Sequence, residues 1–255
     1  MLSAWRNGIE MREITFVGRV VPEALQISAP TMEVALSEQN VEYRFKAQIE
    51  DGSVHVHAWI ASYSEDAFKT AYVRALAFAR GIADLVSFST GFYLHLLFDR
   101  WLEGEESNPV AVRERRVASR CESIANDGEF AEVAEAVLTN HNFRLAMHDL
   151  ASSLGTENYS AIGCGRAVDA LRQLIAGGVD VKSGWSEMRR VLNISREYLQ
   201  FVTDASTAPR HGMRTTVIGS THLETMLRSW TIMDRYIQYV RGGQKPLPIT
   251  EFPEL

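Results

Sequence analysis

The 255-residue sequence has few cysteines, no visible signal peptide and no uninterrupted apolar run long enough to cross a membrane. Its two cysteines, Cys121 and Cys164, lie far apart. This spacing excludes a disulfide framework and indicates reduced thiols. The N-terminus lacks the apolar segment of a secretory signal, and charged residues interrupt the longest apolar stretches. We therefore expect a cytoplasmic protein without a membrane-spanning segment.

Motifs for metal and phosphate-loop chemistry are also missing. The segment Ile162–Arg166 has two glycines but neither a preceding strand nor the Lys-Ser/Thr pair of a phosphate loop, so we interpret the glycines as sites of close helix packing. His55 and His57 share one face of a predicted strand, yet no third or fourth ligand is spaced nearby. His141 and His148 are interpreted as surface residues. We predict no metal and no cofactor.

Composition and charge favour a packed globular protein with an uneven charge distribution. The chain is 46% hydrophobic and 23% charged, and its length suits one large or two modest domains. The net charge of −6 argues against nucleic-acid binding by the chain as a whole. Residues 1–104 hold 9 Lys/Arg against 13 Asp/Glu, whereas residues 140–241 hold 12 against 9. An anionic ligand would therefore prefer the C-terminal part.

The N-terminal hundred residues show strand patterns and one clear hairpin. Strands are predicted at 14–21 and 32–36 from runs of apolar residues. Residues 41–49 and 53–60 alternate between apolar and polar side chains on either side of Asp51-Gly52, a pair that suits a tight turn. We predict that these two segments pair as antiparallel strands.

One long helix and one more strand complete this part. Ser64 provides a cap, and apolar residues recur at helical spacing as far as Val86, before a break at Ser87–Gly91. Alternation from Phe92 to Asp99 favours a strand that returns to the sheet, with a short helix as the alternative. Residues 1–104 are thus predicted to form a small antiparallel sheet covered by one helix.

The second domain, 105–255, is predicted to be all helical. The polar segment Leu102–Pro109 is interpreted as the boundary. Asn193 and Ser195 split one of the predicted helices, and Thr221 with Glu224 forms a capping box at the start of the last one. The expected helices are 129–138, 143–150, 159–175, 186–202 and a C-terminal one from Thr221. The fold class is therefore α+β.

The segment around Arg210 and His211 is the best candidate site. A helix is expected to end near Asp204, Pro209 prevents simple continuation, and Gly212 permits a sharp turn. Arg210 and His211 would then offer a cation for phosphate and a proton-transfer group. The alternative is a structural cap on the helix end.

The C-terminal pattern resembles the HEPN superfamily, in particular its Apea-like and MauJ-like bacterial members. The resemblance covers mainly residues 160–240, and residues 18–23 are similar to the opening of the β-rich region in such members. It rests on Gly165–Arg172, Gly177-Gly178, Trp185-x-x-Met188-Arg189-x-x-Leu192 and Ala208-Pro209-Arg210-His211-Gly212.

The resemblance implies a homodimeric, metal-independent ribonuclease or a nucleotide-binding relative. His211 and Gly212 match the end of the family motif, but Arg210 directly precedes His211, whereas four to six residues separate the arginine and the histidine of that motif. By this resemblance, His211 and Arg210 are the candidate catalytic residues. Arg210, Arg196 and Arg214 are the candidate ligand-binding residues for nucleotide or RNA. A non-catalytic interaction module stays open as the alternative.

Overall fold

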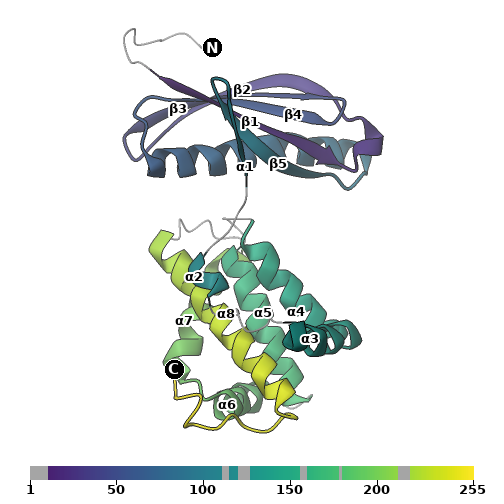
Figure 1. The fold of residues 1–255 in the computed structure, drawn as a ribbon, viewed down its shortest axis with the longest axis vertical. Coiled ribbons are helices and arrows are strands. Elements are labelled where there is room, and N and C mark those ends of the chain that lie inside the picture. Colours follow the sequence, from purple (N-terminus) through teal and green to yellow (C-terminus); the bar gives the residue numbers. More distant parts are fainter. Residues whose placement is uncertain (1–10, 111–114, 120–126, 156–159, 178–179, 212–218) are drawn as a thin grey trace. The chain divides into compact units, whose positions relative to one another are not determined.

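The computed structural model describes residues 11–110, 115–119, 127–155, 160–177, 180–211 and 219–255. The chain divides into two compact units, which we call the sheet unit (Met1–Ala111) and the helical unit (Val112–Leu255). The sheet unit contains a six-stranded antiparallel sheet and one long helix, and the helical unit contains helices alone among its described elements (Figure 1). The α+β class is therefore confirmed. None of the described helices is both long and apolar enough to cross a membrane.

The sheet has the strand order β2-β3-β4-β1-β5-β6. Helix α1 lies along one of its faces (Figure 1). The elements of this unit are β1 (Arg12–Val21), the 3₁₀ turn η1 (Glu23–Leu25), β2 (Ala29–Glu38), β3 (Val41–Glu50), β4 (Ser53–Ile60), α1 (Glu65–Thr90), β5 (His95–Glu103) and β6 (Glu106–Pro109).

The predicted β3–β4 hairpin is confirmed. Asp51 and Gly52 both have positive φ, 47° and 81°, which is the geometry of a tight turn that matches the twist of paired strands. Glu50 lies opposite Ser53, and the pairing continues antiparallel to Ile60. The apolar side chains of both strands point into the core of the sheet unit.

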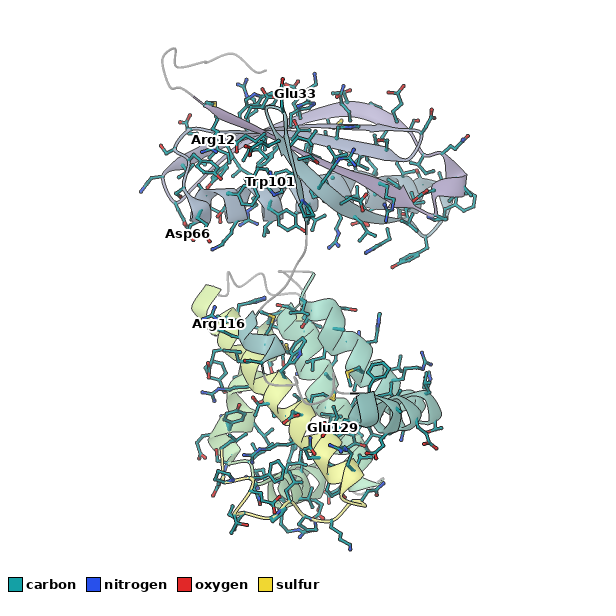
Figure 2. All side chains as sticks on the ribbon, viewed as in Figure 1. Arg12, Glu33, Asp66, Trp101, Arg116 and Glu129 are labelled. Atoms are coloured by element: carbon teal, nitrogen blue, oxygen red, sulfur yellow. The ribbon has the colours of Figure 1, made fainter. Side chains whose placement is uncertain are left out.

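Helix α1 begins as predicted and ends later than predicted. The Ser64 hydroxyl accepts a hydrogen bond from the backbone N–H of Ala67, at 3.1 Å. The helix continues through the predicted break and ends at Gly91, whose φ of 75° only glycine adopts without strain. Trp101 of β5, labelled in Figure 2, packs against Phe68 of α1 with ring centroids 4.9 Å apart. Aromatic contacts of this kind join the helix to the sheet.

The segment interpreted as the domain boundary belongs to the sheet. The returning strand is confirmed as β5, so the short-helix alternative is excluded. Gly104, with a φ of 56°, turns the chain so that Glu106 lies opposite Glu103 and β6 pairs with β5. Polar residues and a proline suit this position because β6 is the edge strand of the sheet. The division between the units therefore follows β6.

The helical unit buries one apolar core between its helices. Its described helices are α2 (Arg115–Ala118), α3 (Asp127–Thr139), α4 (His141–Ser153), α5 (Ser160–Ala176), α6 (Val181–Leu192), α7 (Arg196–Arg210) and α8 (Gly219–Arg241). The predicted split is confirmed, because Asn193 adopts a φ of 52° at the end of α6 and Ser195 caps α7.

Helix α7 corrects the prediction that the chain leaves the helix near Asp204. The helix reaches Arg210, and Pro209 lies in its last turn. Proline removes one backbone donor there without ending the helix, and the N–H of His211 still donates to the carbonyls of Thr207 and Ala208 at 3.2 and 3.1 Å. Gly212 lies outside the described residues.

Helix α8 corrects a second prediction. Residues from Gly219 onward are already helical, so Thr221 is inside the helix and does not cap it. Glu224 forms an ion pair with Arg228, one turn further along α8. Met233, on the same helix, is 2% exposed and belongs to the core. Met226 and Trp230 pack against that core, so the apolar side of α8 faces the interior of the unit.

Helix α3 leaves apolar side chains exposed. Phe130 is 62% exposed, and Leu138 is 74% exposed. Val133 provides the buried contact instead. Phe130 and Leu138 are eight positions, just over two turns, apart, so their exposed side chains lie along one broad side of α3.

Candidate functional site

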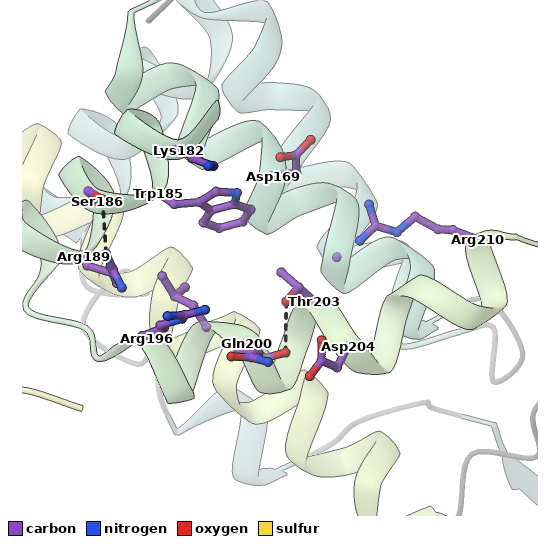
Figure 3. A pocket seen from close by; sticks show the side chains of 12 residues that line it. Asp169, Lys182, Trp185, Ser186, Arg189, Arg196, Gln200, Thr203, Asp204 and Arg210 are labelled. Atoms are coloured by element: carbon purple, nitrogen blue, oxygen red, sulfur yellow. Dashed lines mark hydrogen bonds between the residues drawn. The ribbon is translucent and has the colours of Figure 1, made fainter. Parts of the chain in front are cut away.

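Three helices of the helical unit surround a cavity of about 720 Å³, which we call the basic cavity (Figure 3). Helix α5 contributes residues to one wall, and α6 and α7 contribute the others. The volume lies within the range of roughly 300–1,000 Å³ that is usual for small-molecule sites. The lining residues are Gly165, Asp169, Lys182, Trp185, Ser186, Arg189, Arg196, Leu199, Gln200, Thr203, Asp204 and Arg210.

The turn between α6 and α7 is held by the C-terminal segment of the chain. The side-chain amide of Asn193 donates to the backbone carbonyls of Leu247 and Phe252, at 2.8 and 3.0 Å. The N–H of Ser195 donates to the carbonyl of Leu255, and the N–H of Leu255 donates to that of Asn193. These bonds fix the angle at which the two helices leave the turn.

A buried arginine of α8 reinforces this turn. Arg235 is 5% exposed, and its guanidinium donates to the carbonyls of Leu192 and Asn193 at 2.7 and 2.6 Å. It also donates to the carbonyl of Pro253, at 2.6 Å. Burial lowers the pKa of Arg235 from its ordinary value. Three carbonyl acceptors compensate the buried charge and tie α6, α8 and the C-terminal segment together.

Glycines let α5 approach its neighbours closely, as predicted. A Cβ atom at Gly165 would lie 2.2 Å from the hydroxyl oxygen of Ser206 on α7. A Cβ atom at Gly163 would lie 2.6 Å from the backbone oxygen of Asp149 on α4. Both distances are too short for any real Cβ contact. The glycines therefore set the α5–α7 and α4–α5 spacing, which confirms the packing interpretation.

The basic cavity has more positive than negative side chains. Lys182, Arg189, Arg196 and Arg210 line it, against Asp169 and Asp204. Asp169 is already paired, because it accepts hydrogen bonds from Arg172 at 2.9 Å and from Gln173 at 3.3 Å.

None of the four cations forms an ion pair with a carboxylate among the described residues. Arg189 donates to the hydroxyl of Ser186 at 3.2 Å, and Arg210 donates to the hydroxyl of Ser206 at 2.5 Å. Both bonds go to neutral oxygens, which leaves the positive charges uncompensated. An uncompensated group of cations around one cavity attracts anions.

Trp185 supplies an aromatic surface in the same cavity. Its ring points into the space between Lys182 and Asp169 (Figure 3). Behind it, the guanidinium carbon of Arg172 lies 5.4 Å from the ring centroid, and that side chain is 7% exposed. The ring is therefore held from one side while it contributes to the lining of the cavity.

Some of the predicted site residues line the basic cavity and others do not. Arg196 and Arg210 lie far apart in sequence, and both line the basic cavity. His211 is exposed and does not belong to the lining residues. Arg214 lies outside the described residues. The structure thus brings together two of the three candidate ligand-binding arginines and leaves the candidate catalytic histidine away from the cavity lining.

The histidines of the sheet unit take part in local contacts. The Nδ1 atom of His57 lies 3.1 Å from the hydroxyl of Thr15 and 3.2 Å from a carboxylate oxygen of Glu13. The ring of His57 stacks on Trp59 with centroids 5.9 Å apart. Burial lowers the pKa of His55, and the neighbouring His57 and Arg100 lower it further. No group of three or more metal-binding side chains occurs within the described part of the chain.

Lys182 and Trp185 were missed from the sequence because α6 begins earlier than predicted. Asp180 caps the helix by accepting hydrogen bonds from the N–H groups of Lys182 and Ser183, at 2.9 and 3.3 Å. An aspartate before a helical pattern is a recognised start signal. With this start, residues 182, 185 and 189 recur at helical spacing and fall on one side of α6.

Comparisons with known proteins match both units of the chain. The N-terminal domain of DUF8168, a domain of unknown function, matches residues 14–112, and the C-terminal domain of DUF8168 matches residues 130–241. Neither curated proteins nor solved structures give a match. The two matched ranges follow the sheet unit and the helical unit in order. The chain therefore carries both domains of the DUF8168 family and belongs to that family.

Proposed function

We propose that this protein binds a nucleotide or RNA in the basic cavity of its helical unit. The observation that supports the proposal is the convergence, on a cavity of about 720 Å³, of one tryptophan ring and four cations that form no ion pair with a carboxylate among the described residues. Phosphate groups need cations and hydrogen-bond donors, and a base needs a flat apolar surface on which to stack. The resemblance to the HEPN superfamily points to the same class of ligand.

The lining residues divide the recognition between them. Arg196 and Arg210 on α7 would hold phosphate oxygens, since a guanidinium presents paired donors in a fixed plane. Trp185 on α6 would stack on the base. Gln200 and Thr203 offer neutral hydrogen-bonding groups in the same cavity. The roles can be separated by experiment because they lie on different side chains.

The test is titration of the purified chain with adenosine and uridine monophosphates and with short single-stranded RNA. We expect Trp185→Ala to weaken binding by about 1–3 kcal/mol, the usual contribution of one stacked base. Arg196→Gln should weaken binding and reduce its salt dependence. The matched control is Arg166→Gln, because Arg166 lies on α5, outside the cavity lining, and pairs with Asp149. Absence of binding to all these ligands would refute the proposal.

RNA cleavage is a separate part of the proposal. In a cleavage reaction His211 would act as the general acid or base, and Arg210 would stabilise the charge on the phosphate. Because His211 is not in the cavity lining, we expect cleavage to be slow or absent. Incubation of labelled RNA with the protein and with His211→Ala tests this directly. Rapid cleavage that the variant abolishes would contradict the expectation.

The alternative is a non-catalytic interaction module in which Arg-His-Gly caps a helix. One observation favours it: the guanidinium of Arg210 donates to the backbone carbonyl of Ser206 at 3.3 Å and to its hydroxyl. A cap needs such contacts with its own helix. If Arg210→Ala lowers the melting temperature but leaves nucleotide and RNA binding unchanged, Arg210 is a cap and not a ligand-binding residue.

We also propose that the helical unit forms a homodimer. The exposed residues Phe130 and Leu138 on α3 are the support, because exposed apolar side chains along one helix side favour association. Light scattering at micromolar concentration should report a dimer, and Leu138→Glu should shift it to a monomer. A monomer for the unaltered chain would refute this proposal.

A further inference from the structure

A second hollow adjoins the basic cavity. It has a volume of about 410 Å³ and lies around the turn between α6 and α7. The two hollows share Ser186, Arg189 and Arg196 in their walls. The other residues of the second hollow are Arg190, Asn193, Ile194, Ser195, Ile249 and Glu254. Arg189 and Arg196 therefore stand where the two spaces meet.

The two hollows differ in their chemistry. The basic cavity contains an aromatic ring, Trp185, whereas the residues that line the second hollow include none. The second hollow is bordered by three arginines and a single carboxylate, that of Glu254. It therefore suits phosphate groups and sugar hydroxyls better than a stacked base.

The three arginines that line the second hollow differ in whether they already have a carboxylate partner. Arg196 has no ion-pair partner among the described residues, and Arg189 bonds to the neutral hydroxyl of Ser186. Arg190 pairs with Glu187 on its own helix, and both side chains are more than one third exposed. An exposed pair of this kind contributes little to stability, so Arg190 can exchange its partner for a phosphate.

We infer that the site binds a single-stranded oligonucleotide in preference to a free mononucleotide. One base stacks on Trp185 in the basic cavity, the adjoining phosphate contacts Arg189 and Arg196, and the next phosphate enters the second hollow beside Arg190. This inference rests on the proposed function, because it extends the ligand from the same cavity. The connection of the two hollows through shared arginines is the observation that carries it.

The test compares uridine monophosphate with uridylate chains of two, four and eight nucleotides, using the full chain and fluorescence anisotropy or calorimetry. We expect the tetranucleotide to bind at least about tenfold more tightly than the monophosphate, with a steeper salt dependence. Arg190→Gln should lower tetranucleotide affinity about five- to tenfold, which corresponds to the loss of one charge-assisted contact. It should leave monophosphate affinity unchanged, since Arg190 does not line the basic cavity.

Glu254→Gln provides the opposite variant. Removal of the carboxylate from the second hollow should strengthen tetranucleotide binding and leave monophosphate binding unchanged. For Arg190→Gln, the slope of log affinity against log salt should fall by about 0.7, the value for one phosphate contact on a single strand. Thermal melting of both variants should match that of the unaltered chain, because both side chains are exposed.

Three results would overturn the inference. Equal affinity for the monophosphate and the tetranucleotide would show that the second hollow takes no part, while the proposed nucleotide site itself would stand. If Arg190→Gln lowered the affinities for the monophosphate and the tetranucleotide by the same factor, the substitution would act through the overall charge and not through a contact in the second hollow. Competition by a glutamate peptide of equal charge, as strong as that by the tetranucleotide, would indicate a site for acidic protein segments. If no nucleotide binds at all, the proposed function fails together with the inference.

Discussion

The two units differ in what they bury. The sheet unit has an apolar and aromatic core, whereas every buried polar or charged side chain among the described residues belongs to the helical unit. These are Ser153, Ser160, Arg172, Ser206, Thr225, Ser229 and Arg235. Burial of a polar group lowers the stability of the fold unless the group is hydrogen-bonded. The buried polar side chains of the helical unit therefore need hydrogen-bond partners, and those bonds also hold neighbouring elements in place.

In the helical unit the two buried arginines position the basic cavity. Arg235 holds the α6–α7 turn, and Arg172 lies behind Trp185 and engages Asp169. In the sheet unit, strand pairing and aromatic contacts hold the elements together. One such contact is the stacking of Phe16 on Phe98, with ring centroids 5.4 Å apart. The sheet unit is therefore stabilised mainly by packing, and the helical unit also by the hydrogen bonds of its buried arginines.

Of the substitutions predicted to change stability, Arg235→Met should have the largest effect. The substitution removes the guanidinium donors from the carbonyls of Leu192 and Pro253, and leaves the carbonyl of Asn193 with the N–H of Leu255 as its remaining donor. We expect the helical unit to lose about 3 kcal/mol of unfolding free energy. Urea denaturation with hydrogen exchange on peptides of each unit would measure it.

The matched control for this prediction is Arg190→Met. Arg190 is also an arginine of the helical unit, but it is exposed and pairs with Glu187 on its own helix. Its replacement should leave the urea midpoint almost unchanged. If both variants lost the same stability, the buried arginine would have no special role, and the contrast between the units would fail.

A glycine substitution in each unit should have an intermediate effect on stability, of opposite sign in the two units. Gly165→Ala should destabilise the helical unit by about 1–3 kcal/mol, because the new Cβ would collide with Ser206 and separate α5 from α7. Gly81→Ala on α1 should stabilise the sheet unit by about 0.5–1 kcal/mol, because no atom lies within 4 Å of the new Cβ and alanine favours the helix. Thermal melting of both variants checks the opposite signs, and a shared sign would contradict the prediction.

The smallest expected effect concerns the pH dependence of stability. One carboxylate in each unit should change the unfolding free energy in opposite directions as pH falls. Arg74 donates two hydrogen bonds to Glu38 in the sheet unit and holds the pKa of Glu38 below its ordinary value of 4.5. Burial raises the pKa of Asp234 in the helical unit above its ordinary value of 3.8, although Gln238 and Arg235 partly offset this.

The signs follow from these directions. The Glu38 contribution is present above pH 4.5 and is lost as pH falls through the lowered pKa. Asp234 penalises folding while it is ionised, so its penalty disappears as pH falls through the raised pKa towards 3.8. Glu38→Gln and Asp234→Asn should remove these opposite slopes, each below about 1 kcal/mol between pH 7 and pH 3. Urea titration at several pH values would detect them, and slopes of the same sign would refute the assignment.

Local signals predicted much of the fold and only part of the candidate site. Asp51-Gly52 and the Asn193–Ser195 break were predicted correctly because turn geometry depends on a few adjacent residues. The course of α7 through Pro209 was predicted wrongly, because a proline in the last turn removes one donor without ending the helix, whose hydrogen bonding continues to the N–H of His211. The pairing of β6 was missed because its polar sequence resembles a linker.

Local periodicity and composition account for the two-part α+β organisation, the hairpin turn and the excess of cations in the C-terminal part. Only the packing of the helices brings Lys182, Arg196 and Arg210 to one cavity together with Trp185. Their convergence depends on the spacing of α5 and α7 at Gly165 and on the Arg235 clamp at the α6–α7 turn. Both are long-range packing contacts, and such contacts leave no periodic pattern in the sequence.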